Sequence, residues 1–167
     1  MTRTDEAIIY TDGACLGNPG PGGCAAVVQI GSEQTEKAAG YRLTTNNRME
    51  ILAAIMGLKV LDGPKRVRLH SDSQYVVNAM RQGWARRWKR NGWKRNAREQ
   101  ALNPDLWEEL LRLDDLHAID WIWVRGHSGD DLNERCDRLS TRCARAHADA
   151  VDVAYEALHR RVSDANR

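Results

Sequence analysis

Four acidic residues stand in four separate stretches of the chain, each with a distinctive flank. They are Asp12 in Tyr-Thr-Asp-Gly, Glu50 in Asn-Arg-Met-Glu, Asp72 in His-Ser-Asp-Ser and Asp137 in Glu-Arg-Cys-Asp. If the fold brings them together, four like charges share one small space and need a strong compensating charge. Hard divalent cations such as Mg²⁺ take oxygen ligands. The set therefore predicts two-metal chemistry on a phosphate ester.

Each carboxylate also has an ordinary structural interpretation. Asp12 could start a turn, and Glu50 could complete a capping box at the start of a helix. Asp72 could cap the helix that follows it. Asp137 could pair with a flanking arginine on a helix surface, although its neighbours lie outside the favoured three- or four-residue spacing. The four acids taken together, with their flanks, favour the metal site.

A basic, tryptophan-rich segment lies between Asp72 and Asp137. From residue 81 to residue 98 the chain has eight basic side chains and no acid: Arg81, Arg86, Arg87, Lys89, Arg90, Lys94, Arg95 and Arg98. The net charge of the whole chain is only +2, so this local charge would steer a polyanion more strongly than the net value implies. The alternatives are a solvated face for the cations and local core packing for the tryptophans.

Length and composition indicate one folded domain without a membrane segment. The chain has 167 residues, of which 42% are hydrophobic and 29% charged, and this is typical of a globular protein. The longest apolar run, Ile51 to Leu58, is far too short to span a bilayer. The N-terminus lacks the apolar core of a signal peptide, so we expect a cytoplasmic protein. The four cysteines have no zinc-ligand spacing, and we expect free thiols.

The elements that must position these residues alternate between strands and helices. The predicted strands are 7–11, 24–30, 35–43, 67–70 and 119–124, and the predicted helices are 47–61, 74–80, 106–113 and 131–147. The segment 13–23, with five Gly and two Pro, predicts a loop. Residues 84–98 predict a helix interrupted at Gly92, and Asn103 is expected to cap the helix that starts at Pro104.

This order predicts a mixed α/β sheet in a single domain. We expect the domain to cover residues 1–148. Residues 149–167 are expected to form a C-terminal tail, which either contains a short helix at 151–161 or docks onto the domain.

The chain resembles type 1 ribonuclease H of the bacterial form. The resemblance covers roughly residues 6–145 and rests on six blocks in order: 10–13, 17–23, 44–50, 71–76, 84–93 and 126–137. It implies a five-stranded mixed sheet, with three antiparallel strands followed by parallel ones, flanked by helices. It also implies cleavage of the RNA strand of an RNA–DNA hybrid, leaving 5′-phosphate and 3′-hydroxyl ends. We expect a monomer. His70 departs from the family pattern, which leads us to expect a small polar residue there.

The resemblance assigns the metal ligands to Asp12, Glu50, Asp72 and Asp137. It implies two Mg²⁺ ions per active site with substrate bound, and Mn²⁺ as a substitute. His127, between two glycines of a predicted loop, matches a histidine with a role in proton transfer or product release, and histidine titrates near neutral pH. The alternative is a surface histidine. Glu134 matches an acidic position near the metals, or it is a capping partner within its helix.

The resemblance also implies a surface that holds the hybrid. Asn18 and Thr45 match a pocket for a DNA-strand phosphate, and Asn46 and Asn47 match contacts to the RNA 2′-hydroxyls and base edges. Turn and cap chemistry is the alternative for the asparagines. Two further candidates are Cys15 and Gln74. A basic protrusion would contact the DNA strand through Trp84, Arg87, Trp88, Lys89, Arg90, Trp93 and Lys94.

Three functions are compatible with the sequence, and the hybrid-specific endonuclease is favoured. The second is a non-catalytic hybrid-binding module, which would not need four intact carboxylates. The third is a nuclease or integrase of related fold that acts on DNA, which would not need the asparagines that suit a 2′-hydroxyl.

Overall fold

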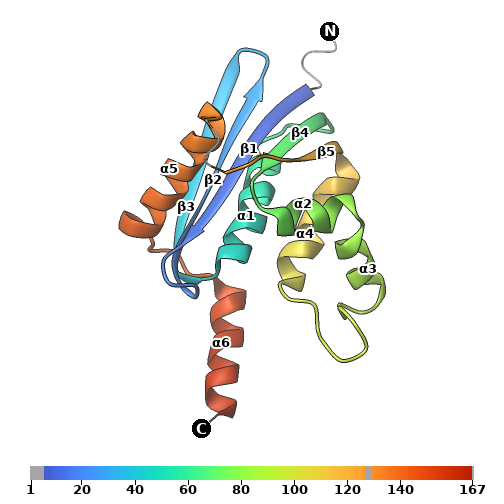
Figure 1. Cartoon of the computed structure of the whole chain (residues 1–167), viewed down its shortest axis with the longest axis vertical. Coiled ribbons are helices and arrows are strands. Elements are labelled where there is room, and N and C mark those ends of the chain that lie inside the picture. The colour runs from blue at the N-terminus through green and yellow to red at the C-terminus, as the bar shows by residue number, and fades with distance from the viewer. Residues whose placement is uncertain (1–5, 127–128, 167) are drawn as a thin grey trace.

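Five strands form one mixed sheet, in the order β3-β2-β1-β4-β5, with helices on both faces (Figure 1). The computed structural model describes residues 6–126 and 129–166. The strands are β1 (Glu6–Cys15), β2 (Gly20–Ile30), β3 (Glu33–Thr44), β4 (Arg66–Ser71) and β5 (Ala118–Trp123). The helices are α1 (Asn46–Lys59), α2 (Gln74–Arg81), α3 (Trp84–Arg90), α4 (Pro104–Leu116), α5 (Asp131–Ala146) and α6 (Val153–Ala165). The predicted fold class is confirmed.

The central strand β1 joins the antiparallel and parallel halves of the sheet. It pairs antiparallel with β2 and parallel with β4, and β4 pairs parallel with β5. In the parallel register Thr11 lies opposite Ser71. Since the carboxyl ends of parallel strands meet at one edge, the residues that follow, Asp12 and Asp72, are placed side by side.

Strand β2 is buried on both faces because helices cover it on both sides. Cys24 packs with Met49 of α1, whereas Ala25 and Val27 pack with Cys136 of α5. Successive side chains of a strand point to opposite faces, so this run is continuously apolar instead of alternating. All four cysteines of the chain are free thiols, as expected.

The larger core lies between the sheet and the helices α1, α2 and α4. Trp107 of α4 is fully buried and meets the rings of Tyr75 and Trp88 edge-on, at centroid distances of 5.4 and 5.9 Å. Trp84 and Trp93 are partly buried against the same core. The tryptophans of the basic segment therefore pack the protrusion onto the domain.

Three local predictions hold only in part. Strand β1 continues to Cys15 and β2 begins at Gly20, so only residues 16–19 form the predicted loop. Helix α3 ends at Arg90, since Gly92 and Trp93 both have a positive φ and turn the chain into a loop. Helix α4 begins at Pro104 with Asn103 as its N-cap residue, as predicted, but the Asn103 side chain makes no capping hydrogen bond and instead accepts one from Arg48 Nη1 at 3.3 Å.

The C-terminal segment is tied to the start of α1 by a buried ion-pair network. Arg48, which is 4% exposed, donates to Asp152 at 2.7 and 2.9 Å and to Asp105 at 2.9 and 2.8 Å. Thr44 Oγ1 donates to the same Asp152 carboxylate at 2.7 Å. Helix α6 then extends away from the sheet (Figure 1). The domain boundary at residue 148 stays a prediction.

No helix in the described parts of the chain is both long enough and apolar enough to cross a membrane.

Replacing Asp152 by alanine should destabilise the fold. The change leaves a buried guanidinium with one carboxylate in place of two, and removing one partner of a buried pair costs on the order of 3 kcal/mol. Urea unfolding measures the loss. The matched control is Glu156→Ala, which removes the partner of Arg42, whose side chain is 58% exposed; its loss should be clearly smaller. Equal losses in the two variants would contradict this account of the network.

Candidate active site

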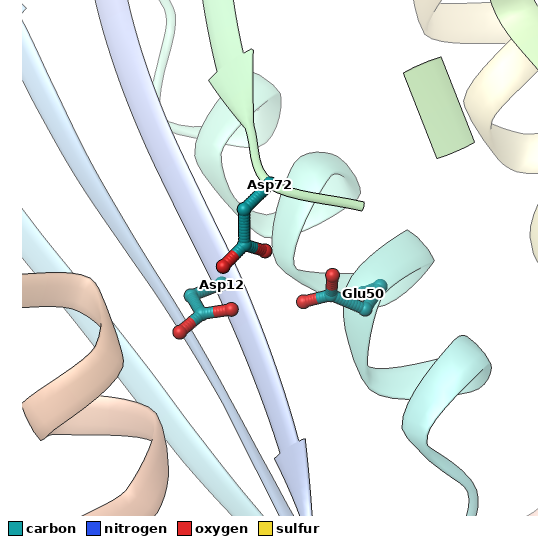
Figure 2. Close-up of side chains that lie close together, drawn as sticks. All are labelled: Asp12, Glu50 and Asp72. Atoms are coloured by element: carbon teal, nitrogen blue, oxygen red, sulfur yellow. The ribbon is translucent and has the colours of Figure 1, made fainter. Parts of the chain in front are cut away.

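Three carboxylates from three elements point toward one another at the end of the parallel strands (Figure 2). Asp12 comes from β1, Glu50 from α1, and Asp72 from the segment just after β4. One oxygen from each lies within 4.8 Å of the others. Asp12 and Glu50 are 4% and 5% exposed, and Asp72 is half-buried. The structure thus brings together three of the four predicted metal ligands as one compact group.

Gly13 allows α1 to approach β1 closely enough to form this group. A Cβ atom at this position would lie 2.5 Å from the backbone nitrogen of Glu50, so any other residue would push the helix away. The Gly13 N–H donates to Asp12 Oδ1 at 2.9 Å and also to Glu50 Oε1. The sequence analysis treated Gly13 only as part of a loop; the signal for its role is its place directly after the strand carboxylate.

Asp137 lies beside this group, on α5. Its negative charge helps to raise the Asp12 pKa, after burial and the charge of Asp72. The neighbouring Arg135 donates to Glu36 Oε2 of β3 at 2.7 Å. Asp137 therefore contributes a fourth carboxylate at the edge of the site.

The electrostatics of the site favour the binding of a cation. Burial is the main cause that raises the pKa of Asp12 to about 8, and the charge of Asp72 adds to it. Burial also raises the pKa of Glu50 well above its ordinary value, and the charges of Asp12 and Asp72 raise it further. Such a crowded set becomes fully ionised only beside a strong positive charge. A donor set made only of carboxylate oxygens fits a hard divalent metal ion.

The capping alternatives for the carboxylates are wrong. Thr45 is the N-cap of α1, and its hydroxyl accepts a hydrogen bond from the Arg48 N–H at 3.2 Å. Ser73, and not Asp72, caps α2, since its hydroxyl accepts from the Val76 N–H at 3.2 Å. Asp72 and Glu50 are thus free of cap roles and face Asp12 instead.

The segment after β5 passes directly beside Asp72. A Cβ atom built on Gly126 would lie 3.1 Å from Asp72 Oδ2, so the chain approaches the carboxylate at a residue without a side chain. His127, the predicted proton-transfer residue, lies outside the described residues. Glu134 lies in the first turn of α5.

Four of the predicted hybrid contacts gather at the amino end of α1. Asn18 Oδ1 accepts a hydrogen bond from the Asn46 N–H at 3.0 Å. Asn18, Thr45 and Asn47 line one groove, together with Tyr155 of α6. Of the other two candidates, Cys15 ends β1 with its thiol 3.5 Å from the Thr44 carbonyl oxygen, and Gln74 is exposed at the start of α2.

The basic protrusion directs its cations outward. Arg87, Arg90 and Lys94 are exposed, and Lys89 lies 3.9 Å from Glu108 Oε1. Arg86 instead donates to Asp114 and Asp115 at 2.6 and 2.8 Å, so it fastens α3 to α4. Because the tryptophans face inward, the side of the protrusion that faces solvent is mainly basic.

Known proteins are similar to this chain in both sequence and fold. A ribonuclease H of Syntrophus aciditrophicus is 64% identical over 139 residues, which are 83% of this chain and 80% of that protein. A ribonuclease HI of Synechocystis is 51% identical over 157 residues, 93% of this chain and 98% of that protein. The crystal structure of LC9-RNase H1, a type 1 RNase H with the type 2 active-site motif, superposes with a TM-score of 0.76 at 32% identity, covering 98% of this chain and 84% of that one.

The family model for RNase H matches residues 4–145. This range includes all five strands, the helices α1 to α4 and all but the last residue of α5. The resemblance seen in the sequence is therefore confirmed, and the chain belongs to the RNase H family.

Proposed function

We propose that this protein is an endonuclease that hydrolyses the RNA strand of RNA–DNA hybrids and leaves 5′-phosphate and 3′-hydroxyl ends. The observation that carries the proposal is the convergence of Asp12, Glu50 and Asp72 within 4.8 Å in a chain of the RNase H family. A binding module would gain nothing from burying like charges that repel one another.

The carboxylates Asp12, Glu50, Asp72 and Asp137 would hold the metal ions, Mg²⁺ by preference and Mn²⁺ as a substitute, two per site with substrate bound. Bound divalent metals lower the pKa of an attacking water and stabilise the leaving oxygen. The protein's own contribution is rigidity: Asp12 lies within β1, Asp72 directly follows the neighbouring β4, and the Gly13 N–H donates to both Asp12 and Glu50. Because these groups are already in place, they need not rearrange during the reaction, and this lowers the activation barrier for hydrolysis.

His127 would exchange a proton with the leaving group or the product. Glu134, in the first turn of α5, would add negative charge near the metals.

The hybrid would be held on both sides of the carboxylates. At the amino end of α1, Asn46 and Asn47 would contact the RNA 2′-hydroxyls, and Asn18 and Thr45 a DNA phosphate. Cys15 would contribute through its backbone, and Gln74 through its amide. The DNA strand would pass over the protrusion, where Arg87, Lys89, Arg90 and Lys94 would contact it, while Trp84, Trp88 and Trp93 would hold the protrusion in place against the core. We also propose a cytoplasmic monomer with residues 1–148 as the catalytic domain.

The proposed activity can be tested with end-labelled RNA–DNA, RNA–RNA and DNA–DNA duplexes in Mg²⁺, Mn²⁺ or chelator. We expect RNA to be cut only in the hybrid and only with metal. Asp72→Asn should lower kcat by at least about 10³-fold, because a metal contributes several kcal/mol. Asp62→Asn, an exposed acid in the loop after α1, is the control and should retain activity. Binding without cutting would favour the binding module, and cutting of DNA–DNA would favour the related nuclease.

Metal binding should depend on pH through Asp12. Since the folded protein raises the pKa of Asp12 to about 8, the native state holds more protons than the unfolded chain between about pH 4 and that value. The contribution of this group to the stability of the metal-free protein therefore falls as the pH rises through that interval. A metal must displace the proton, so it binds more tightly at higher pH.

We accordingly expect Mg²⁺ to raise the Tm of the wild type more at about pH 8 than at about pH 5.5. Asp12→Asn removes one of the carboxyl protons that the metal must displace and leaves that of Glu50, whose pKa burial also raises, so its smaller Mg²⁺ shift should vary less with pH. Differential scanning fluorimetry measures both. An Asp12→Asn protein with the same pH-dependent shift as the wild type would contradict the assignment.

The basic protrusion should contribute to the salt dependence of hybrid binding. Replacing Arg87, Lys89 and Arg90 by alanine removes three candidate phosphate contacts, and each contributes roughly 0.9 to the slope of log Kd against log salt. We expect the slope to fall by about two to three, measured with fluorescent hybrid and Asp72→Asn protein. The control is a triple alanine variant of Lys65, Arg66 and Arg68, at the opposite end of β4 from Asp72. Equal slopes for the two triple variants would contradict a role for the protrusion in binding the hybrid.

A further inference from the structure

A second layer of side chains lies directly behind the carboxylates. Tyr10 and His70 are register partners on the parallel strands β1 and β4, and each stands two residues before a carboxylate of the site. Since side chains of a strand alternate between faces, Tyr10 shares its face of β1 with Asp12. The two rings are stacked, with centroids 4.2 Å apart and planes 3° from parallel.

The hydroxyl of Tyr10 connects β1 to the start of α5. It donates to Asp130 Oδ2 at 3.1 Å. Asp130 is the N-cap of α5, and its other oxygen accepts from the N–H groups of Leu132 and Asn133 at 3.1 and 3.3 Å. One carboxylate thus caps the helix and also ties that helix to the central strand.

A second link joins the same tyrosine to the residue next to Asp137. The Cys136 thiol donates to the backbone carbonyl of Tyr10 at 3.2 Å. Leu132 and Leu139 of α5 and Tyr10 of β1 all pack against the apolar cluster of Ala25, Val27 and Cys136. Apolar contacts carry little directional information, so the hydrogen bonds at Tyr10 fix where α5 lies along the strand.

His70 orients the tyrosine. Its Nδ1 lies 3.2 Å from the Ile9 carbonyl oxygen, and its ring lies flat on that of Tyr10. This contact limits the rotation of the tyrosine side chain and keeps the hydroxyl directed at Asp130. The residue that departs from the family pattern therefore has a structural partner one layer behind the metal ligands.

We propose that Tyr10 is a positioning residue: with His70 and Asp130 it sets the start of α5 relative to β1, and so the place of Asp137. The inference rests on the proposed hydrolysis of hybrids. It predicts an effect on kcat, because a displacement of about 1 Å in a catalytic group can cost up to about 10²-fold in rate.

The variants that test it are Tyr10→Phe, Asp130→Ser and the double variant. Phenylalanine retains the ring and its packing, and serine retains a good N-cap but is too short to reach the tyrosine as well. The control is Tyr75→Phe, which removes a hydroxyl that accepts a hydrogen bond from Trp107 at 3.4 Å, away from α5. Each protein is assayed on the hybrid with Mg²⁺, with kcat and KM separated.

We expect Tyr10→Phe and Asp130→Ser each to lower kcat about tenfold with KM nearly unchanged. The double variant should be no slower than the slower single variant, because both changes break one interaction. Tyr75→Phe should leave kcat within about twofold. A Tyr10→Phe enzyme with wild-type kcat, or losses that multiply in the double variant, would overturn the proposal.

Hydrogen exchange of the metal-free protein gives a readout that does not need activity. Tyr10→Phe removes the hydrogen bond from Tyr10 to Asp130. This loss should speed exchange of the amides at the start of α5 about fivefold, with no change in the exchange of amides in α1. Unchanged exchange at the start of α5 would overturn the positioning role even in an active enzyme. Failure of the wild type to cut hybrids, with faster exchange in Tyr10→Phe, would instead overturn the proposed function alone.

Discussion

Repulsion among buried carboxylates is the constraint on which the rest of this structure depends. Asp12 and Glu50 are almost fully buried beside Asp72, although each of these charges would be more stable in water. A flexible chain would separate such groups. The rigid elements around them prevent this separation, so the carboxylates stay close together and a bound cation would relieve their repulsion.

Each element that supports the site opposes a different movement of the carboxylates. The parallel pairing of β1 and β4 holds Asp12 next to Asp72, and the absence of a side chain at Gly13 lets α1 bring Glu50 close. Helix α5 packs on the opposite face of the sheet from α1 and carries Asp137. The site is thus built from both faces of the sheet and from sequence positions that span most of the chain.

The sequence was sufficient to predict the order of strands and helices, because apolar periodicity and flanking turn residues are local signals. It also singled out the three carboxylates that the fold brings together, because each has a distinctive flank. The prediction of a loop over residues 13–23 was wrong at Gly13. Local propensity places glycine in turns, whereas at Gly13 the absence of a side chain lets the backbones of β1 and α1 approach each other closely. The links of Tyr10 with Asp130 and of Arg48 with Asp152 join residues more than 100 positions apart, and no local pattern encodes such pairs.

Two buried charge clusters lie two residues apart on α1, at Arg48 and Glu50, and their charges are balanced in opposite ways. At Arg48 the carboxylates of Asp105 and Asp152 surround a guanidinium that neutralises them, and a neutralised cluster holds elements together without attracting an ion. At Glu50 the neighbours are the carboxylates of Asp12 and Asp72 and a backbone N–H. Around Arg48, where the carboxylates only stabilise the fold, the protein itself supplies the cation as an arginine side chain. Where it leaves the positive charge to be supplied from outside, the carboxylates can bind a metal and, through it, a phosphate.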